Sequence, residues 1–177
     1  MIPAALVGIL AVNRLGAIHA TVFGGFAPTA LAQRIDASRP VVVLTASCGI
    51  VDSVKPPVAY RDFVTAAVRR SDFKPPRTIV WQREQLRWEP LRRDAGERVW
   101  QKLIASARNR GVKAACVPVR SDEVGCLCWS PRSPGTAHLA NVVRSSPRGC
   151  EYAQREVTLR DAISFTPVEL RACLKGW

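Results

Sequence analysis

Patterns typical of helices and of strands alternate along the first two-thirds of the chain. Apolar residues recur at helical spacing over 3–15, 28–39 and 60–70, and the first two of these stretches open with a proline. Short apolar, β-branched runs cover 17–23, 41–45 and 78–81. Continuous apolar strands between helices are typical of a parallel sheet covered on both faces, so the pattern predicts an α/β fold.

Two further features refine this prediction. The helix over 3–15 is apolar almost all the way round, which predicts burial on most of its sides. The stretch 97–110 has an amphipathic period with Trp100 on its apolar stripe, which predicts a helix that ends at Gly111 and a tryptophan packed in the core.

Proline-rich and polar stretches separate these elements. Lys55-Pro56-Pro57 and Lys74-Pro75-Pro76 predict loops, and 84–96 is polar without a clear period. After Glu123 the chain becomes rich in Pro, Ser, Gly and Arg. We therefore expect one partial domain over 1–123, and a largely irregular segment over 124–177 with a short capped helix at 167–174.

Positive charge is concentrated in the middle of the chain. The 177 residues carry a net charge of +12, and 61–120 hold fifteen basic residues against six acidic ones. Such an excess favours a polyanionic partner, which could be nucleic acid, a phosphorylated cofactor or an anionic membrane surface. A solvated arginine-rich surface without a partner is the alternative explanation.

The cysteines and the apolar N-terminus argue against a metal-binding, a secreted and a membrane-spanning protein. Six cysteines include no Cys-x-x-Cys pair, and Cys126-Leu-Cys128 has the wrong spacing for a usual zinc site, so we predict no metal site and reduced cysteines in an intracellular protein. The N-terminal apolar run has no basic region before it. Arg14 interrupts it short of the roughly 20 residues that a membrane helix needs, so we expect neither a signal peptide nor a membrane span.

A pair of glycines follows the predicted strand 17–23. Gly24 and Gly25 precede Pro28, and a strand, a bare-backbone turn and a helix start can bind phosphate or form an ordinary tight turn. His19 lies within the apolar strand with no acidic residue nearby in sequence, which predicts a hydrogen-bonded core histidine and not a base or a ligand.

The block IPAALVGILAVNRLGAIHATVFGGFAPTALAQRIDASRPVVVLTAS resembles the N-terminal subdomain of short-chain acyl-CoA synthetases, the acetate– and propionate–CoA ligases of the adenylate-forming, AMP-binding superfamily. The resemblance is dense over 2–49, weaker over 50–115, and returns at Cys116-Val117-Pro118-Val119. It implies part of a parallel-sheet α/β subdomain and a reaction that joins a carboxylate to CoA through an acyl-adenylate, with release of AMP and pyrophosphate.

By this resemblance the cofactors are CoA, ATP and Mg²⁺, and the CoA contacts are Phe23, Gly24 and Gly25, whose bare backbone allows close approach. Where the family has arginines for the 3′-phosphate of CoA, only Lys55 supplies a cation. No residue is assigned to catalysis or to a metal. Related proteins work in the cytoplasm or in mitochondria.

The chain departs from the family after Glu123. A Thr-Ser-Gly-Thr-Thr-Gly-x-Pro-Lys-Gly nucleotide loop is expected there, but Pro131 and Pro134 remove backbone donors and no lysine stands at the loop position. The lid signatures of the family are also missing. We therefore expect an incomplete ligase that is inactive as this chain alone. A shifted reading frame and a divergent tail both remain open.

Two other functions are compatible with the sequence. A non-catalytic basic module could contact nucleic acid through 61–120, although no recognition motif supports this. A non-enzymatic interaction protein derived from a synthetase is the other possibility.

Overall fold

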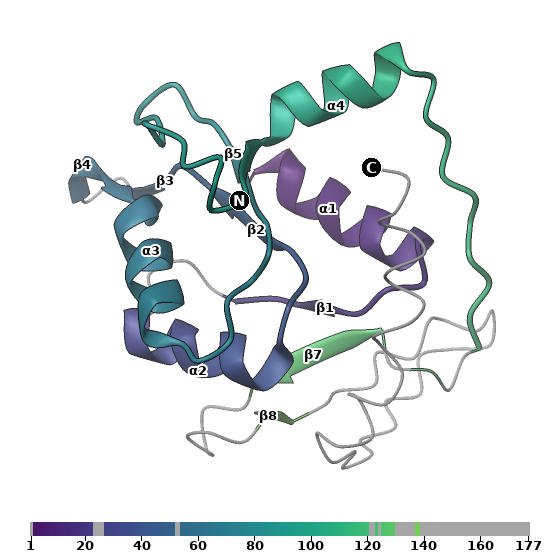
Figure 1. Cartoon of the computed structure of the whole chain (residues 1–177), viewed down its shortest axis with the longest axis horizontal. Helices are drawn as coiled ribbons and strands as arrows, with labels where there is room; N and C mark the ends of the chain where they lie inside the picture. Colours follow the sequence, from purple (N-terminus) through teal and green to yellow (C-terminus); the bar gives the residue numbers. More distant parts are fainter. Residues whose placement is uncertain are drawn as a thin grey trace. The chain divides into compact units, whose positions relative to one another are not determined.

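The computed structural model describes residues 2–22, 27–51, 54–120, 123, 125–129 and 137–138 (Figure 1). The chain divides into two compact units, one made of Met1–Thr21 with Ala114–Trp177 and the other of Val22–Lys113. The predicted helix at 167–174 lies outside the described residues.

In its described residues, the first unit contains one helix and three short strands. They are α1 (Pro3–Arg14), β1 (His19–Ala20), β7 (Cys126–Trp129) and β8 (Ala137–His138). β7 pairs parallel to β1, with Cys126 opposite His19, and antiparallel to β8. The strand predicted over 17–23 is therefore shorter than expected among the described residues, and the segment expected to be largely irregular contributes β7.

The prediction that α1 is buried on most sides is wrong. Leu6 and Leu10 are each 58% exposed and Val7 is 51% exposed, whereas the small residues Ala4 and Gly8 form the buried face. Ala4 and Gly8 lie four residues apart, so they share one face of the helix, and the longer apolar side chains point elsewhere. The start of α1 at Pro3 agrees with the sequence.

The second unit is a mixed α/β structure with a small parallel sheet. Its elements are α2 (Pro28–Ser38), β2 (Val43–Ala46), β3 (Cys48–Val51), β4 (Val54–Ala59), α3 (Tyr60–Arg70), β5 (Thr78–Trp81), β6 (Glu97–Val99) and α4 (Trp100–Asn109). The sheet has the order β2-β5-β6, and both strand pairs are parallel. The predicted α/β class with parallel pairing is confirmed.

Helices α2 and α3 lie side by side and cover the sheet (Figure 1). One buried cluster joins Ala32 and Ile35 of α2 to Ala67 of α3. A second cluster joins Val64 of α3 to Val80 of β5 and to Trp88. α2 ends at Ser38, and the left-handed backbone of Arg39 (φ 42°) turns the chain before Pro40.

The prediction of a loop at Lys55-Pro56-Pro57 is wrong. These residues belong to β4, which pairs antiparallel with β3 in a two-stranded ribbon. The ladder is regular at Gly49 opposite Val58 but shifts between Gly49 and Val51. Prolines have no N–H to donate, and an irregular ladder on a strand with a free edge is where a sheet tolerates them.

The prediction that a helix begins at Glu97 is also wrong, because 97–99 form β6 and α4 begins only at Trp100. The backbone N–H of Thr78 donates to the carbonyl of Gly96 across 3.2 Å, which starts the parallel pairing of β6 with β5. The helical period of α4 and its end before Gly111 agree with the sequence. Among the described residues, no helix has the length and apolar character needed to cross a membrane.

Candidate functional site

The carboxyl ends of β2 and β5 meet at one edge of the sheet, which is where ligands commonly bind in open α/β sheets. Ser47 follows β2 and is 1% exposed. Its hydroxyl accepts a hydrogen bond from the backbone N–H of Arg83 across 2.8 Å, and its backbone N–H donates to Trp81 across 2.9 Å. Ser47 is therefore a buried link between the two strand ends.

Gln82 is held in the same way. Its side chain accepts from the N–H of Trp88 and donates to the carbonyl of Trp88, each across 2.9 Å. Its backbone donates to the side chain of Gln101 across 3.2 Å and accepts from it across 2.8 Å. These polar groups are occupied within the protein, so the described part of this edge does not by itself form a cradle for a nucleotide.

The structure describes only the backbone of one predicted CoA-contact residue, Lys55. Phe23, Gly24 and Gly25 lie outside the described residues. Lys55 lies on β4, and the described part of the structure does not include its side chain. Nearby, the Tyr60 ring lies directly over the Cα of Gly49, because a Cβ built there would be 2.7 Å from Tyr60 Cζ. The ring thus packs the β3–β4 ribbon against α3.

A buried carboxylate organises the loop before β6. Glu97 is 2% exposed, and its Oε2 accepts from Trp88 Nε1 (3.2 Å) and from the backbone N–H of Arg92 (2.8 Å). Its Oε1 accepts from Arg92 Nε (3.0 Å) and Nη2 (2.7 Å) in a forked pair. Arg92 Nη2 also donates to Thr65 Oγ1 on α3 across 3.2 Å.

These contacts set the charge of Glu97. Burial alone would raise the pKa of Glu97, but hydrogen bonds from Arg92 and Trp88 and the positive charge of Arg92 bring that pKa below its usual value. Glu97 is therefore an ionised, fully paired structural carboxylate. Sequence reasoning missed it because its partners are fixed by the folded loop and not by spacing.

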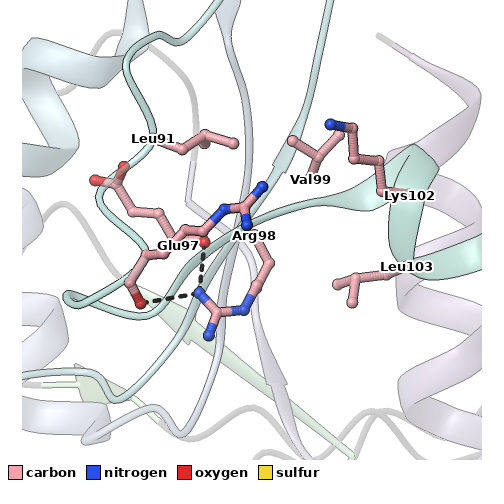
Figure 2. Close-up of a pocket in the computed structure, with 7 residues that line it drawn as sticks. Leu91, Glu97, Arg98, Val99, Lys102 and Leu103 are labelled. Carbon is pink, nitrogen blue, oxygen red and sulfur yellow. Dashed lines mark hydrogen bonds between the residues drawn. The ribbon is translucent and has the colours of Figure 1, made fainter. Parts of the chain in front are cut away.

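A shallow pocket of about 250 Å³ lies between β6 and α4 (Figure 2). Its lining joins three cationic side chains to three apolar ones and to Glu97; the lining residues are Leu91, Arg93, Glu97, Arg98, Val99, Lys102 and Leu103. Figure 2 shows Lys102 and Leu103 entering from α4, and Arg98 and Val99 from β6. The sequence carried a signal for this pocket only as the charge excess over 61–120.

The tryptophans in this region pack within the protein to different degrees. Trp88 is 1% exposed within the cluster of Val64 and Val80. The rings of Trp81 and Trp100 pack on one another with centroids 6.1 Å apart and planes tilted by 58°. Trp100 is half-buried and packs on Trp81, so its predicted place in the core is met only in part, whereas the buried Trp88 offers no face to a base.

His19 differs from the prediction. Its Nδ1 is buried and has no hydrogen-bond partner among the described residues, whereas the sequence predicted a hydrogen-bonded core histidine. Burial lowers the pKa of the imidazole, which favours the neutral form. Cys48 and Cys126 are buried cysteines and Cys116 is an exposed one, and none of the three forms a disulfide. Within the described ranges, no three His, Cys, Asp or Glu side chains gather as a metal site would need.

Comparison with known proteins identifies relatives over three-quarters of the chain. Acyl-CoA synthetase short-chain family member 3, mitochondrial, of Rattus norvegicus is 38% identical over 135 residues, which is 76% of this chain and 19% of that protein. Acetyl-coenzyme A synthetase of Leptospira biflexa is 31% identical over 141 residues, which is 76% of this chain and 20% of that protein. These relatives are acid–CoA ligases by name.

Another relative, an uncharacterized protein of Pseudomonas aeruginosa, is 44% identical over 109 residues, covering 60% of this chain and 16% of that protein. No family model matches the chain. The chain is thus homologous to short-chain acyl-CoA and acetyl-CoA synthetases, and it spans about a fifth of their length. This supports the resemblance drawn from the sequence block at 2–49.

Proposed function

We propose that this chain forms part of the N-terminal subdomain of an AMP-forming acetate– or propionate–CoA ligase of the adenylate-forming superfamily. The observation that carries the proposal is the homology to short-chain acyl-CoA synthetases over 76% of the chain. The parallel order β2-β5-β6 beneath α2 and α3 is consistent with such a subdomain. In the complete reaction a carboxylate and ATP give an acyl-adenylate and pyrophosphate, and CoA then displaces AMP.

In this proposal the turn at Phe23, Gly24 and Gly25 contacts CoA, and Lys55 supplies the cation near its 3′-phosphate. A lysine is a point charge without the planar guanidinium of arginine, so it would bind the phosphate with less defined geometry. The described ends of β2 and β5 have polar groups that are hydrogen-bonded within the protein, and they do not fit a nucleotide by themselves. We therefore assign no step of the reaction to residues of this chain.

We further propose that this polypeptide alone does not make acyl-CoA and that its setting is intracellular, in the cytoplasm or in mitochondria. Incubation of the 177-residue chain with ATP, Mg²⁺, CoA and either acetate or propionate tests the first part. No acid-dependent AMP is expected. Acid-dependent turnover by the chain would overturn this part of the proposal.

The CoA assignment has its own test. Calorimetric titration with CoA and with dephospho-CoA, which lacks the 3′-phosphate, is compared in the chain and in Lys55→Ala. The substitution is expected to weaken binding of CoA and to leave dephospho-CoA unchanged, because only CoA presents the phosphate that the cation would attract. Lys113→Ala, at an exposed lysine of the same unit, is the matched control. If both substitutions weaken CoA binding equally, or if Lys55→Ala weakens CoA and dephospho-CoA equally, Lys55 does not contact the 3′-phosphate.

A further inference from the structure

We propose that the pocket between β6 and α4 binds a small phosphate-bearing anion. Arg93, Arg98 and Lys102 bring three positive charges to a space of about 250 Å³. Cations gathered in a concave surface attract and retain an anion more strongly than the same charges spread over a flat one. The lining of this pocket shares no residue with the turn and the lysine considered for CoA, and the proposal does not depend on ligase activity.

The only acidic side chain in the pocket lining of the described structure does not cancel these charges. Both oxygens of Glu97 are taken by Arg92 and Trp88, at distances of 2.7 to 3.2 Å. The charge of Glu97 is therefore balanced by Arg92, which does not line the pocket. Arg93, Arg98 and Lys102 remain as the net charge that a ligand would meet.

One of the three cations is already held in place. Arg98 Nη1 donates to the carbonyl oxygens of Arg93 (3.0 Å) and Glu97 (2.8 Å), shown as dashed lines in Figure 2. Its Nε and Nη2 donate to no other described residue. A guanidinium fixed before binding loses less conformational entropy when a ligand arrives, which favours affinity. A planar guanidinium also matches the geometry of phosphate oxygens.

The size and the remaining lining favour a small ligand. Sites for drug-sized molecules usually measure roughly 300–1,000 Å³, so this pocket suits a phosphate or diphosphate group better than a whole nucleotide. Leu91, Val99 and Leu103 are half-buried apolar neighbours, which reduce the local dielectric and strengthen the attraction. Nucleic acid is less well matched, because Trp88 is buried and the rings of Trp81 and Trp100 pack on one another.

The test is calorimetric titration of the 177-residue chain with inorganic diphosphate and with adenosine 3′,5′-bisphosphate. The test variant is Arg93→Gln with Lys102→Gln, and the control is Arg69→Gln with Arg108→Gln, which removes the same charge from exposed positions outside the pocket. The test variant should lose about tenfold or more in affinity, since it removes two of the three cations that would make charge-assisted hydrogen bonds to the anion. The control should lose about twofold or less, as expected of screened surface charge.

The two ligands separate a free anion from one carried by a nucleotide. Tighter binding of the bisphosphate indicates that the natural ligand is a phosphate carried by a nucleotide. Equal or tighter binding of diphosphate indicates a free anion. Either result supports the proposed pocket if the test variant binds the ligand more weakly. Absence of saturable binding would overturn the proposal, and so would equal losses in both variants. Binding of single-stranded DNA that both variants weaken alike would also overturn it, in favour of a diffuse basic surface.

Discussion

Trp88 Nε1 donates a hydrogen bond to Oε2 of Glu97 across 3.2 Å, between side chains of residues that are 1% and 2% exposed. The same oxygen accepts the backbone N–H of Arg92 across 2.8 Å. Through this carboxylate the polar loop before β6 is tied both to the hydrophobic core and to the edge of the sheet. Glu97 therefore links the buried Trp88 to β6, the strand that pairs with β5.

Replacement of Glu97 by alanine should lower the free energy of unfolding by about 2–3 kcal/mol. The substitution leaves the Trp88 indole N–H buried without an acceptor, and an unsatisfied buried donor costs about 1–3 kcal/mol. Arg92 is 43% exposed and can return to water, which limits the additional loss. Urea unfolding measures the change. Glu84→Ala, at an exposed carboxylate, is the control and should shift stability by less than about 0.5 kcal/mol; equal effects would contradict the role given to Glu97.

Acid should destabilise the protein in two steps. The pKa of His19 lies below its usual 6.5 and that of Glu97 below its usual 4.5. A group whose pKa is lowered by folding binds protons more readily in the unfolded chain, so stability is lost as pH falls below the unfolded value. The free energy of unfolding should therefore decline below pH 6.5 and more steeply below pH 4.5.

Two variants assign these steps. His19→Gln should flatten the decline that begins below pH 6.5, and Glu97→Gln should reduce the steepness below pH 4.5, because neither glutamine titrates. Urea midpoints collected across this pH range give the comparison. An acid profile that neither substitution changes would show that other groups control the response.

Gly96 should be far less tolerant of a side chain than Gly111. Both have positive φ angles, +76° and +63°, where an added Cβ costs roughly 1–2 kcal/mol. A Cβ at Gly96 would also collide with the carbonyl of Pro76, since it would lie 3.1 Å from Pro76 C, whereas a Cβ at Gly111 meets nothing within 4 Å. We expect Gly96→Ala to lower the free energy of unfolding by about 3 kcal/mol or more, because the steric clash adds to the cost of the positive φ angle.

The measurement is thermal or urea unfolding of the two alanine variants side by side. Because Gly96 precedes β6, the loss in Gly96→Ala should be accompanied by faster amide exchange at Thr78, whose N–H donates to the Gly96 carbonyl. Similar costs at the two glycines would refute the close approach of Gly96 to Pro76.

The sequence predicted the elements whose information is local. The β-branched runs at 41–45 and 78–81 give β2 and β5, although β2 begins at Val43. The amphipathic period at 60–70 gives α3 with the same bounds. Each run of this kind carries its own burial pattern, so no knowledge of distant contacts is needed.

Features fixed by tertiary contacts were missed. Glu97 looked like the polar start of a helix because its fork with Arg92 forms only in the folded loop. Trp88 lies in a polar stretch without a helical or strand period, so its burial could not be predicted. Pro56 predicted a loop, but it lies in a strand whose pairing is irregular. The candidate CoA contacts at 23–25 rest on the family resemblance, and they lie outside the described residues.

The exposed apolar face of α1 should promote self-association. Leu6 and Leu10 are one turn apart and each 58% exposed, so they form a continuous patch and not scattered single residues. Leu6→Ser with Leu10→Ser should lower concentration-dependent light scattering. Leu86→Ser, at a 36% exposed leucine in a loop, is the control and should leave scattering unchanged. Equal scattering in all variants would show that the α1 face does not drive association.

We propose that residues 2–120 are a working part of an acid–CoA ligase. The most direct measurement replaces the homologous segment of the Leptospira biflexa acetyl-coenzyme A synthetase with residues 2–120 of this chain and follows AMP formation from ATP, CoA and acetate or propionate. We predict acid-dependent AMP formation by the hybrid. A hybrid that folds and elutes like the parent enzyme but forms no AMP would contradict the claim.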